Sequence, residues 1–573
     1  MKDKLWQLAE PISADILGQF PELDPVLLQL LWNRGLKDQA AIDEFLNPDW
    51  LADVHDPFLF KDMKRAVERI YEAIGGNQTI GVFGDYDADG VTAAVIITST
   101  LKKLGAKVEV YLPHREREGY GLNEEAIRYL KDRGVSLLIT CDCGVANPSQ
   151  VSLANSLGLT VIVTDHHQAQ AELPAAFAIL HPGLAGESYP FKFLSGGGVA
   201  FKLVQGLLRY EGCHLSQTER EIQEKWLLDL VAISTVADMV KLTGENRTLV
   251  KYGLTVLRKT RRLGLKKLIE VAGLNFDDLD TYAIGFQIAP RINAAGRMDH
   301  ANAAYALLMS ENSTEAEELA RSINLTNSQR QAITDVMFKE ACEQIGKINI
   351  KTFFIQAYKP EWSLGLVGLV AGKLVQQYNR PALVMCQVGD KIAGSGRAGV
   401  GGFDLANALT ACSEYLVSFG GHKEAAGFSL SINQLENFLS KFAKLAKAHL
   451  SGQDLTAKLA VDAVFTLDKI DWHIAEQVEL LEPFGQGNPG ARFASYGVLI
   501  ANTQPVGSAG QHLRLELSFE SSHQRFIWFN SAESSKQFSI GDKVDVVYEV
   551  GVNEWNNTRQ LELKVVDIKK SDS

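Results

Sequence analysis

The stretch TIGVFGDYDADGVTAAV (residues 79–95) joins a strand pattern to an acidic turn and an apolar helix pattern. The run 79–84 predicts a buried β-strand, and residues from about 92 to 104 predict a helix. If the loop between them is extended, Asp87 and Asp89 point to the same side, next to Asp85. A calcium loop would need another acidic ligand near residue 96, but residues 91–101 contain no carboxylate. Metal ligation and a solvated acidic turn both remain open for this motif alone.

Further strand patterns follow at 107–112, 136–141 and 160–164, with helical stretches between them. This alternation predicts a parallel sheet covered on both faces, which binds ligands at the carboxyl ends of its strands. Asp142 in TCDCG (140–144) and His166 and His167 in VTDHH (163–167) stand at two such ends. Asp238 in STVADMV (234–240) ends an apolar helix pattern, and by itself is as readily a surface residue. We expect these side chains to meet at one edge of the sheet.

These candidate ligands are rich in oxygen and include one or two histidines. Such a set suits Mn²⁺ or Mg²⁺ better than zinc or copper. A carboxylate that bridges two metals about 3.5–4 Å apart is the arrangement used for phosphoester hydrolysis, in which the metals lower the pKa of a bound water. The sequence therefore predicts a metal-dependent phosphoesterase that needs no nucleophilic side chain.

The composition excludes several other classes of protein. The chain has 573 residues, of which 46% are hydrophobic and 22% charged, as in folded proteins of several domains. Its net charge of −12 excludes nucleic-acid binding by bulk charge and leaves only a local channel. Six cysteines are too few for a disulfide scaffold. We find no apolar run long enough for a membrane helix and no secretory signal, so we expect a cytoplasmic protein without membrane contact.

Five segments are predicted along the chain. They are a helical N-terminal extension (1–75), the α/β domain around the acidic turn (76–240), a helical connector (241–345), a second α/β domain (346–452) and a C-terminal segment (453–573) with the short strands of a small antiparallel barrel.

The C-terminal segment does not favour electrostatic binding of DNA. Residues 451–573 contain 11 Lys/Arg and 17 Asp/Glu. Its aromatic residues could instead stack on bases, although alternation along strands would bury about half of them; they are Phe526, Trp528, Phe529, Tyr548 and Trp555.

Taken together, the motifs resemble the DHH phosphoesterase superfamily, and within it the RecJ family of single-stranded-DNA exonucleases. The resemblance covers roughly residues 20–450 and rests on GDYDADGVT, PHREREGYGL, TCDCG, VTDHH, STVADMV, APRINAAGRM (289–298), EWSLGLVGLVAGKL (361–374), GSGRA (394–398) and FGGHKEAAG (419–427). It implies an α/β multidomain fold with a parallel-sheet DHH domain, a long helical connector, an α/β DHH-associated domain and a C-terminal OB-like β-barrel. Two residues depart from the family's common pattern, which has Asn at the positions of His114 and Cys143.

The resemblance also implies roles for individual residues. Asp87 and Asp142 would hold one Mn²⁺ or Mg²⁺ ion, and Asp89, Asp142, His166 and Asp238 the other, with Asp85 in the same cluster. His167 would support the ligands or contact the scissile phosphate, which makes Asp142, His166 and His167 the catalytic set.

Other residues would bind the substrate. Arg115, Ser395 and Arg397 would bind the 5′-terminal phosphate, with Gly420, Gly421 and His422 nearby; we interpret GSGRAG (394–399) as a glycine-rich turn that lets an anion approach the backbone. Arg291, Asn293 and Arg297 are candidate DNA contacts, with helix packing as the alternative.

The function expected from the resemblance is a metal-dependent 5′→3′ exonuclease that degrades single-stranded DNA to 5′-mononucleotides in DNA repair and recombination. A helicase and a single-strand-binding protein would supply its substrate. The alternatives are a phosphodiesterase acting on cyclic dinucleotides or nanoRNA, and a non-catalytic Cdc45-like replisome scaffold.

Overall fold

The structure, a computed structural model, describes residues 4–298, 300–399, 401–532, 534–555 and 558–571. The chain forms two compact units, which we describe separately. One contains residues 1–53, 241–248 and 456–573, and the other contains residues 54–240 and 249–455. The N-terminal extension predicted as 1–75 is thus divided between the units, and the predicted domain boundaries remain predictions.

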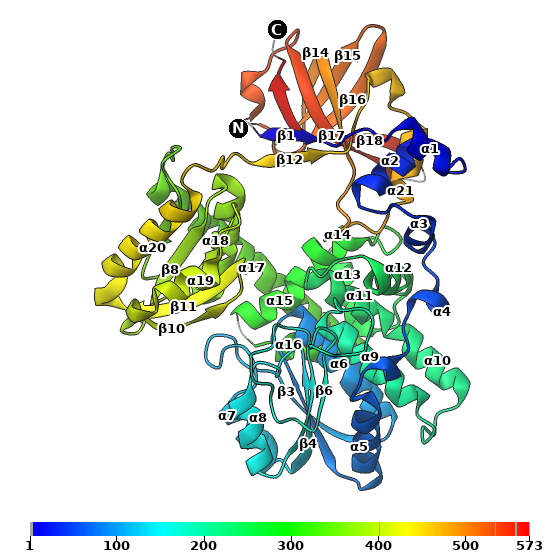
Figure 1. The fold of residues 1–573 in the computed structure, drawn as a ribbon, viewed down its shortest axis with the longest axis vertical. Helices are drawn as coiled ribbons and strands as arrows, with labels where there is room; N and C mark the ends of the chain where they lie inside the picture. The colour runs from blue at the N-terminus through cyan, green and yellow to red at the C-terminus, as the bar shows by residue number, and fades with distance from the viewer. Residues whose placement is uncertain (1–3, 299, 400, 533, 556–557, 572–573) are drawn as a thin grey trace. The chain divides into compact units, whose positions relative to one another are not determined.

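The larger unit contains a sheet of five parallel strands in the order β3-β2-β4-β5-β6. Its strands are β2 (Thr79–Gly84), β3 (Lys107–Tyr111), β4 (Val135–Cys141), β5 (Thr160–Thr164) and a short edge strand, β6 (Ala178–Leu180). Phe83, Leu138 and Val161 pack with α7 (Glu124–Asp132) and α8 (Pro148–Ser156) on one face. The helices α5 (Met63–Gly75), α6 (Ala88–Lys103) and α9 (Gly196–Arg209) pack on the other face (Figure 1). The predicted doubly covered parallel sheet is confirmed.

Helix α6 begins earlier than predicted. Asp87 is its N-cap, and Oδ1 of Asp87 accepts hydrogen bonds from the amides of Asp89 (3.0 Å) and Gly90 (3.1 Å). The extended loop predicted through Asp89 was therefore wrong, because an aspartate at this position satisfies the first free amides of a helix. Asp89 lies in the first turn of α6 instead.

A group of helices follows the sheet. They are α10 (Gln217–Trp226), α11 (Leu228–Ala237), α12 (Gly244–Leu257), α13 (Leu263–Val271), α14 (Thr281–Ala283), a π-helical turn (Ile284–Ile288), α15 (Ala289–Met298), α16 (Asn302–Met309) and α17 (Ser313–Ile345). Helix α11 is apolar on all sides because it packs against α6 and α9, and Asp238 caps its C-terminus.

The second sheet of this unit has the order β10-β11-β9-β8-β7. Its strands are β7 (Ile355–Tyr358), β8 (Ala382–Val388), β9 (Lys391–Arg397), β10 (Leu416–Gly421) and β11 (Ala425–Ser431), and its helices are α18 (Leu364–Tyr378), α19 (Leu405–Ala411) and α20 (Leu435–Leu450). The prediction that GSGRAG (394–399) is a turn was wrong for residues 394–397, since they lie within β9. A Cβ at Gly394 would lie 2.7 Å from atoms of Met385 and Phe428, so this glycine serves close packing within the sheet.

The smaller unit contains a closed five-stranded barrel. Its strands are β14 (Arg492–Val506), β15 (His512–Phe519), β16 (Ser522–Trp528), β17 (Lys543–Trp555) and β18 (Thr558–Lys570), with β13 (Ala463–Val464) at the side of β14 and α21 (Trp472–Glu479) packed against β17. The predicted antiparallel barrel was wrong at one pairing, because β16 and β18 run parallel with Phe526 opposite Leu563. Of the candidate stacking residues, Phe526, Trp528 and Tyr548 are buried, Phe529 is exposed, and the side chain of Trp555 lies outside the described part.

The N-terminal residues complete this unit. They form β1 (Leu5–Leu8), α1 (Ala14–Gln19), α2 (Pro25–Asn33), α3 (Gln39–Leu46) and α4 (Trp50–Asp53), and β1 pairs in parallel with β12 (Lys458–Val461). An entirely helical extension was therefore a wrong prediction for residues 5–8. Leu28 and Leu31 share one hydrophobic core with Ile474 and Phe493 of the C-terminal segment. Among the described residues, no helix is both long and apolar enough to cross a membrane.

Candidate active site

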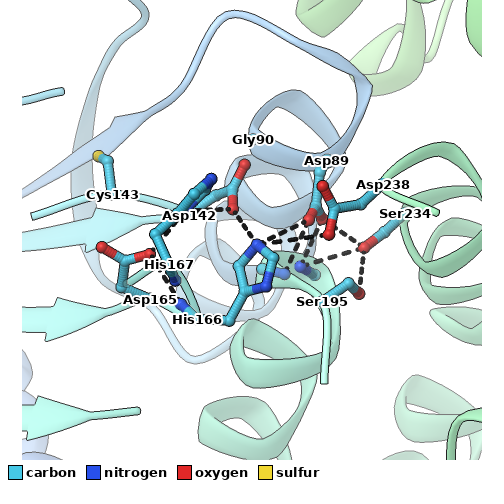
Figure 2. Close-up of polar contacts among 12 residues, drawn as sticks. Asp89, Gly90, Asp142, Cys143, Asp165, His166, His167, Ser195, Ser234 and Asp238 are labelled. Atoms are coloured by element: carbon cyan, nitrogen blue, oxygen red, sulfur yellow. Dashed lines mark hydrogen bonds and ion pairs between the residues drawn. The ribbon is translucent and has the colours of Figure 1, made fainter. Parts of the chain in front are cut away.

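Side chains from four segments meet at the carboxyl edge of the parallel sheet. Asp85 follows β2, Asp142 follows β4, and His166 lies two residues beyond β5. Because these three strands are neighbours in the sheet, their ends lie side by side. Asp238 enters from the C-terminus of α11, and Figure 2 shows Asp89, Asp142, His166 and Asp238 converging.

His166 lies among three of the carboxylates. Its Nε2 atom is 3.0 Å from Oδ1 of Asp142, 3.5 Å from Oδ2 of Asp238 and 3.7 Å from Oδ2 of Asp89. Asp142 also groups with Asp85 and Asp87, with one ligand atom of each within 4.8 Å of the others. The cluster thus offers two neighbouring sets of ligand atoms that meet at Asp142.

Several atoms in the cluster have no partner. Oδ1 of Asp85, Oδ1 of Asp142 and Nε2 of His166 are buried without a hydrogen bond to any described residue. Such atoms are rare in folded proteins because burying them is costly, and they call for an explanation such as a bound ion. Carboxylate oxygens with one imidazole are ligands suited to Mn²⁺ or Mg²⁺. The residues present therefore fit a divalent-metal centre, and those that would hold it are Asp85, Asp87, Asp89, Asp142, His166 and Asp238.

The electrostatics of the cluster agree with this fit. Burial, and then the charge of Asp87, raises the pKa of Asp89 to about 6. Burial and the neighbouring carboxylates raise the pKa values of Asp85, Asp142 and Asp238 well above their usual range. Carboxylates this close do not all ionise unless a cation offsets their charge. Burial, and then the neighbouring His167, lowers the pKa of His166 to about 3, which leaves the imidazole neutral, as a metal ligand must be.

Asp142 has an unusual backbone conformation. Its φ of 63° lies in the left-handed region, which a residue other than glycine adopts only when its surroundings hold it there. Its amide donates a hydrogen bond to the carbonyl oxygen of Thr164 (2.9 Å), at the end of the neighbouring strand. This contact ties the Asp142 turn to the segment that carries His166.

The carboxylate of Asp89 is held by residues that the sequence prediction missed. The amides of Gly196 and Gly197, in the first turn of α9, donate to its two oxygens at 2.8 and 2.7 Å. Ser234 of α11 donates its hydroxyl to Oδ1 of Asp89, and Ser195 lies 2.7 Å from the Ser234 hydroxyl. A Cβ at Gly196 would lie 2.4 Å from Oδ1 of Asp142, so only glycine fits there. The run SGGG (195–198) was the available sequence signal, because glycines that open a helix commonly let backbone amides approach an anion.

His167 lies between two carboxylates. Its Nδ1 atom is 2.9 Å from Oδ1 of Asp165 and 3.7 Å from Oδ1 of Asp142. Burial would raise the pKa of Asp165, but hydrogen bonds and charge from His167 lower it to about 2. Burial would likewise lower the pKa of His167, but Asp165 raises it to about 9. The contact with Asp165 therefore favours the protonated form of His167, which also lies within one group of possible metal ligands with Asp142 and His166.

Two further residues position His167, and the sequence prediction assigned neither a role. The hydroxyl of Tyr120 lies 2.9 Å from Nδ1 of His167 and 3.2 Å from the carbonyl oxygen of Asp142, to which it donates. Nδ1 of His181 accepts the amide of Gly183 (3.0 Å), so its Nε2–H donates to the carbonyl oxygen of His167 (2.6 Å). An isolated histidine such as His181 has no motif around it that could have indicated this contact.

Two of the residues expected to bind a terminal phosphate, Arg115 and Arg397, lie close enough to interact electrostatically. The guanidinium of Arg115 lies 4.7 Å from the ring centre of Tyr86, inside the acidic turn. On β9, Nη1 of Arg397 donates to the hydroxyl of Ser395 (3.2 Å) and the carbonyl oxygen of Gly396 (2.9 Å). Burial, and then repulsion by Arg115, lowers the pKa of Arg397. Two like charges held together in this way favour a bound anion.

The three candidate DNA contacts on α15 make contacts within the protein. Oδ1 of Asn293 accepts the amide of Ala88 (2.8 Å) and so fixes the start of α6. Nε of Arg291 donates to Oδ1 of Asn324 (3.0 Å). Both contacts correspond to the packing alternative.

Arg297 differs from these two residues. Its Nη1 donates to the carbonyl oxygen of Gly365 (3.2 Å), while its buried Nε has no partner among the described residues. Burial, and then repulsion by Arg115 and Arg330, lowers the pKa of Arg297 to about 9.

His422 lies in the β10–β11 hairpin. Its amide donates to the carbonyl oxygen of Ala425 (2.8 Å), and the residue is exposed. Within the described part of the chain, no hydrogen bond joins its side chain to Ser395 or Arg397. Its role in substrate binding stays a prediction.

Known proteins match three parts of the chain and also its whole length. Residues 79–235 match the DHH family N-terminal domain, residues 350–448 the DHHA1 domain, and residues 461–567 the RecJ OB domain. The single-stranded-DNA-specific exonuclease RecJ of Bacillus subtilis (strain 168) is 38% identical over 99% of this chain and 71% of its own. The RecJ of Escherichia coli (strain K12) is 31% identical over 96% of each chain.

The chain belongs to the RecJ family. A crystal structure of RecJ from Thermus thermophilus in complex with Mn²⁺ matches it with a TM-score of 0.83 and 27% identity, covering 99% of this chain and 80% of that one. The same protein in complex with Mg²⁺ matches with a TM-score of 0.77 and 26% identity, covering 99% and 79%.

The structure accounts for one of the two departures from the RecJ pattern. Nδ1 of His114 accepts the amides of Glu116 (3.2 Å) and Arg117 (3.4 Å), the contacts that an asparagine side chain makes when it starts a turn. Cys143 is fully buried, and its carbonyl oxygen accepts the hydroxyl of Thr140 (2.7 Å). Nothing in the structure explains why cysteine stands at this second position.

Proposed function

We propose that this member of the RecJ family is a metal-dependent exonuclease that degrades single-stranded DNA from the 5′ end to 5′-mononucleotides. The observation that carries the proposal is the convergence of Nε2 of His166 and Oδ1 of Asp142, both unpartnered among the described residues, with further carboxylates at one sheet edge. RecJ relatives named as single-stranded-DNA-specific exonucleases and RecJ structures with Mn²⁺ and Mg²⁺ support it.

The residues of the cluster would have different roles in hydrolysis. Two bound divalent ions would supply a water of lowered pKa and positive charge for the phosphate oxygens. Asp142 would be shared by the two ligand sets, and the neutral imidazole of His166 would offer Nε2. Asp165 holds the His167 cation beside Asp142, where its charge stabilises the negative charge that builds up on the phosphate during attack.

The polarity of digestion would come from the arginines outside the metal cluster. A 5′-terminal phosphate carries a second negative charge that an internal phosphodiester lacks, and arginine binds such a group through two donors. Arg115 beside the acidic turn and Arg397 with Ser395 on β9 support a pocket for this group. A terminal phosphate bound there would fix the register, so that one nucleotide is released in each cycle.

The proposed substrate also implies protein partners and a cellular process. We propose single-stranded DNA as the substrate and, since such an enzyme needs unwound strands, a helicase and a single-strand-binding protein as partners. Cytoplasmic DNA repair and recombination would be the process served.

End-labelled strands test the proposal. With Mn²⁺, a long 5′-labelled strand should release labelled mononucleotide at once, a 3′-labelled strand only at the end, and a circular strand none. Early release from the 3′-labelled strand would contradict the polarity. Hydrolysis of cyclic dinucleotides in place of long strands would favour the small-substrate alternative, and binding of DNA without hydrolysis of either would favour a scaffold.

A further inference from the structure

A carboxylate occupies the start of α18, beside the proposed phosphate pocket. Oε1 of Glu116, in the loop after β3, accepts the amide of Gly365 in the first turn of this 15-residue helix (3.1 Å). The N-cap of α18, Ser363, makes no side-chain hydrogen bond to the helix. Because the free amides and the dipole of a helix attract anions at its N-terminus, Glu116 occupies a position suited to a phosphate.

The same face of α18 leads to the phosphate-binding residues. Gly365 and Gly368 are three residues apart and so lie on one side of the helix. A Cβ at Gly365 would lie 3.1 Å from Oε1 of Glu116, and one at Gly368 would lie 3.2 Å from the Ser395 hydroxyl and 3.4 Å from Nη2 of Arg397. The Glu116 carboxylate and the Arg397 guanidinium therefore face neighbouring turns of one helix surface.

A second observation indicates an anion at this place. Arg297 donates through Nη1 to the carbonyl oxygen of Gly365, and its buried Nε has no partner among the described residues. Arg115 and Arg397 also lie close enough to repel each other. In the described part of the chain, no ion pair joins Glu116 to any of these arginines. The arginines are thus left for another anion.

The loop around Glu116 is fixed by contacts that do not involve the Glu116 carboxylate. The neighbouring Glu118 is fixed by the amide of His114 (2.6 Å), the hydroxyl of Tyr111 (2.8 Å) and the side chain of Asn123 (3.0 Å). Glu116 is exposed, and its carboxylate has the Gly365 amide as its one hydrogen-bond partner among the described residues. Loss of the contact with α18 would therefore leave the hydrogen bonds of Glu118 within the loop intact.

We propose that Glu116 is an internal competitor for the 5′-phosphate pocket, which lowers the affinity for the bound end and so speeds release of the mononucleotide product. The inference rests on the proposed function. The 5′-phosphate of the strand and that of the released mononucleotide are the same chemical group, so a pocket that binds one tightly also retains the other. When the Glu116 carboxylate returns to the Gly365 amide, it weakens the binding of both the strand and the product. Faster product release raises kcat, and weaker binding of the strand raises KM.

The test is inhibition of the Mn²⁺-loaded full-length chain by thymidine 5′-monophosphate. In Glu116→Gln the side chain keeps an oxygen acceptor for α18 but loses its charge, so a purely structural cap would be preserved. We expect the inhibition constant to fall about tenfold, and kcat and KM on 5′-phosphorylated strands to fall together. Glu124→Gln, which removes one exposed charge on α7, is the matched control and should change nothing.

Arg397→Ala separates the two proposals. If this variant does not raise the inhibition constant, the phosphate pocket itself is wrong. If it does, and Glu116→Gln leaves the constant unchanged or raises it in a protein of unaltered melting temperature, the pocket stands and the competitor role is overturned. A lower constant in both Glu116→Gln and Glu116→Ala supports that role.

Discussion

Nε2 of His166 lies 3.0 Å from Oδ1 of Asp142, and neither atom is hydrogen-bonded to any residue in the described part of the protein. The two atoms lie at the distance of a hydrogen bond, yet no hydrogen bond joins them. His166 is neutral there, and burial with the neighbouring carboxylates raises the pKa of Asp142. Without metal, the neighbouring carboxylates therefore repel one another. With metal, their oxygens and Nε2 of His166 would be ligands.

Replacing the shared carboxylate tests this relationship. Asp142→Asn should lower Mn²⁺-dependent hydrolysis by roughly three orders of magnitude or more, since both ligand sets lose an oxygen. The same change should raise the melting temperature in EDTA, because it removes a buried charge that its neighbours repel. Asp132→Asn, at an exposed position of α7, is the control. Near-normal hydrolysis by the folded variant would contradict the assignment.

The pH dependence of stability should reveal the same repulsion. The pKa of Asp89 is raised from 3.8 to about 6, so the folded protein holds a proton between these values that the unfolded chain has lost. As pH rises from about 4 to 6, Asp89 therefore lowers the stability of the metal-free protein, whereas His166, whose pKa is lowered from 6.5 to about 3, raises it over the same range. The contribution of Asp89 is the difference between the wild type and Asp89→Asn. His167, with its pKa raised to about 9, titrates above this window.

Thermal unfolding in EDTA at several pH values across this window measures the net change and, by comparison with Asp89→Asn, the fall that Asp89 contributes. Saturating Mn²⁺ should remove it, because ligands bound to metal stay ionised. Asp89→Asn should reduce it in the metal-free protein. An undiminished fall in that variant would show that a different group titrates.

The support of Asp89 gives a third prediction. Ser234→Ala removes the hydroxyl that donates to Asp89 but leaves the two glycine amides in place. Loss of a group that orients a metal ligand typically costs 10- to 100-fold in metal affinity or activity, and we expect the lower end here. Ser99→Ala on α6, whose hydroxyl donates to the carbonyl oxygen of Ile96 in the same helix, is the matched control. Equal Mn²⁺ affinities of the two variants, measured by calorimetry, would count against the role.

The sequence predicted the strands of the first sheet well, but it did not predict the residues that hold the Asp89 carboxylate in place. The apolar runs that end at Asp85 and Asp142 predict buried parallel strands, because such strands are apolar on both faces. The link between Ser234 and Asp89 spans 145 residues and depends on how α11 packs against α6, which no local pattern contains.

The wrong predictions for β9 and for the barrel also concern contacts between segments that no local pattern contains. The run GSGR (394–397) is compatible with a turn or with a strand, and its pairing with β8 on one side and β11 on the other decides for the strand. The parallel pairing of β16 with β18 is equally invisible to alternation, since both directions of pairing share the same period of two.

The divided core of the smaller unit predicts how truncations behave. Removing residues 456–573 alone leaves Leu28, Leu31 and Phe45 without the core they share with the C-terminal segment, so this fragment should aggregate. A fragment of residues 54–455 lacks those exposed helices and should be more soluble. The soluble fraction of the two proteins after expression is the measurement, and equal solubility would contradict the shared core.

The soluble fragment also tests the barrel's part in DNA binding. We expect residues 54–455 to keep hydrolysis of very short strands, because every candidate metal ligand lies in this fragment. On long strands KM should rise, since the OB domain would no longer contribute contacts. Equal losses on short and long strands would argue that the barrel supports the fold of the catalytic domain instead.

The last prediction concerns the end that the enzyme recognises. Arg397→Ala removes a guanidinium that lies close enough to Arg115 to repel it, outside the metal cluster. One charge-assisted contact is worth about 1.5–3 kcal/mol, so the preference for a 5′-phosphate over a 5′-hydroxyl, measured as a ratio of kcat/KM, should fall roughly 10- to 150-fold. Mn²⁺ affinity should stay unchanged. Arg321→Ala, at an exposed site on α17, is the matched control, and the same ratio in both variants would show that Arg397 does not recognise the end.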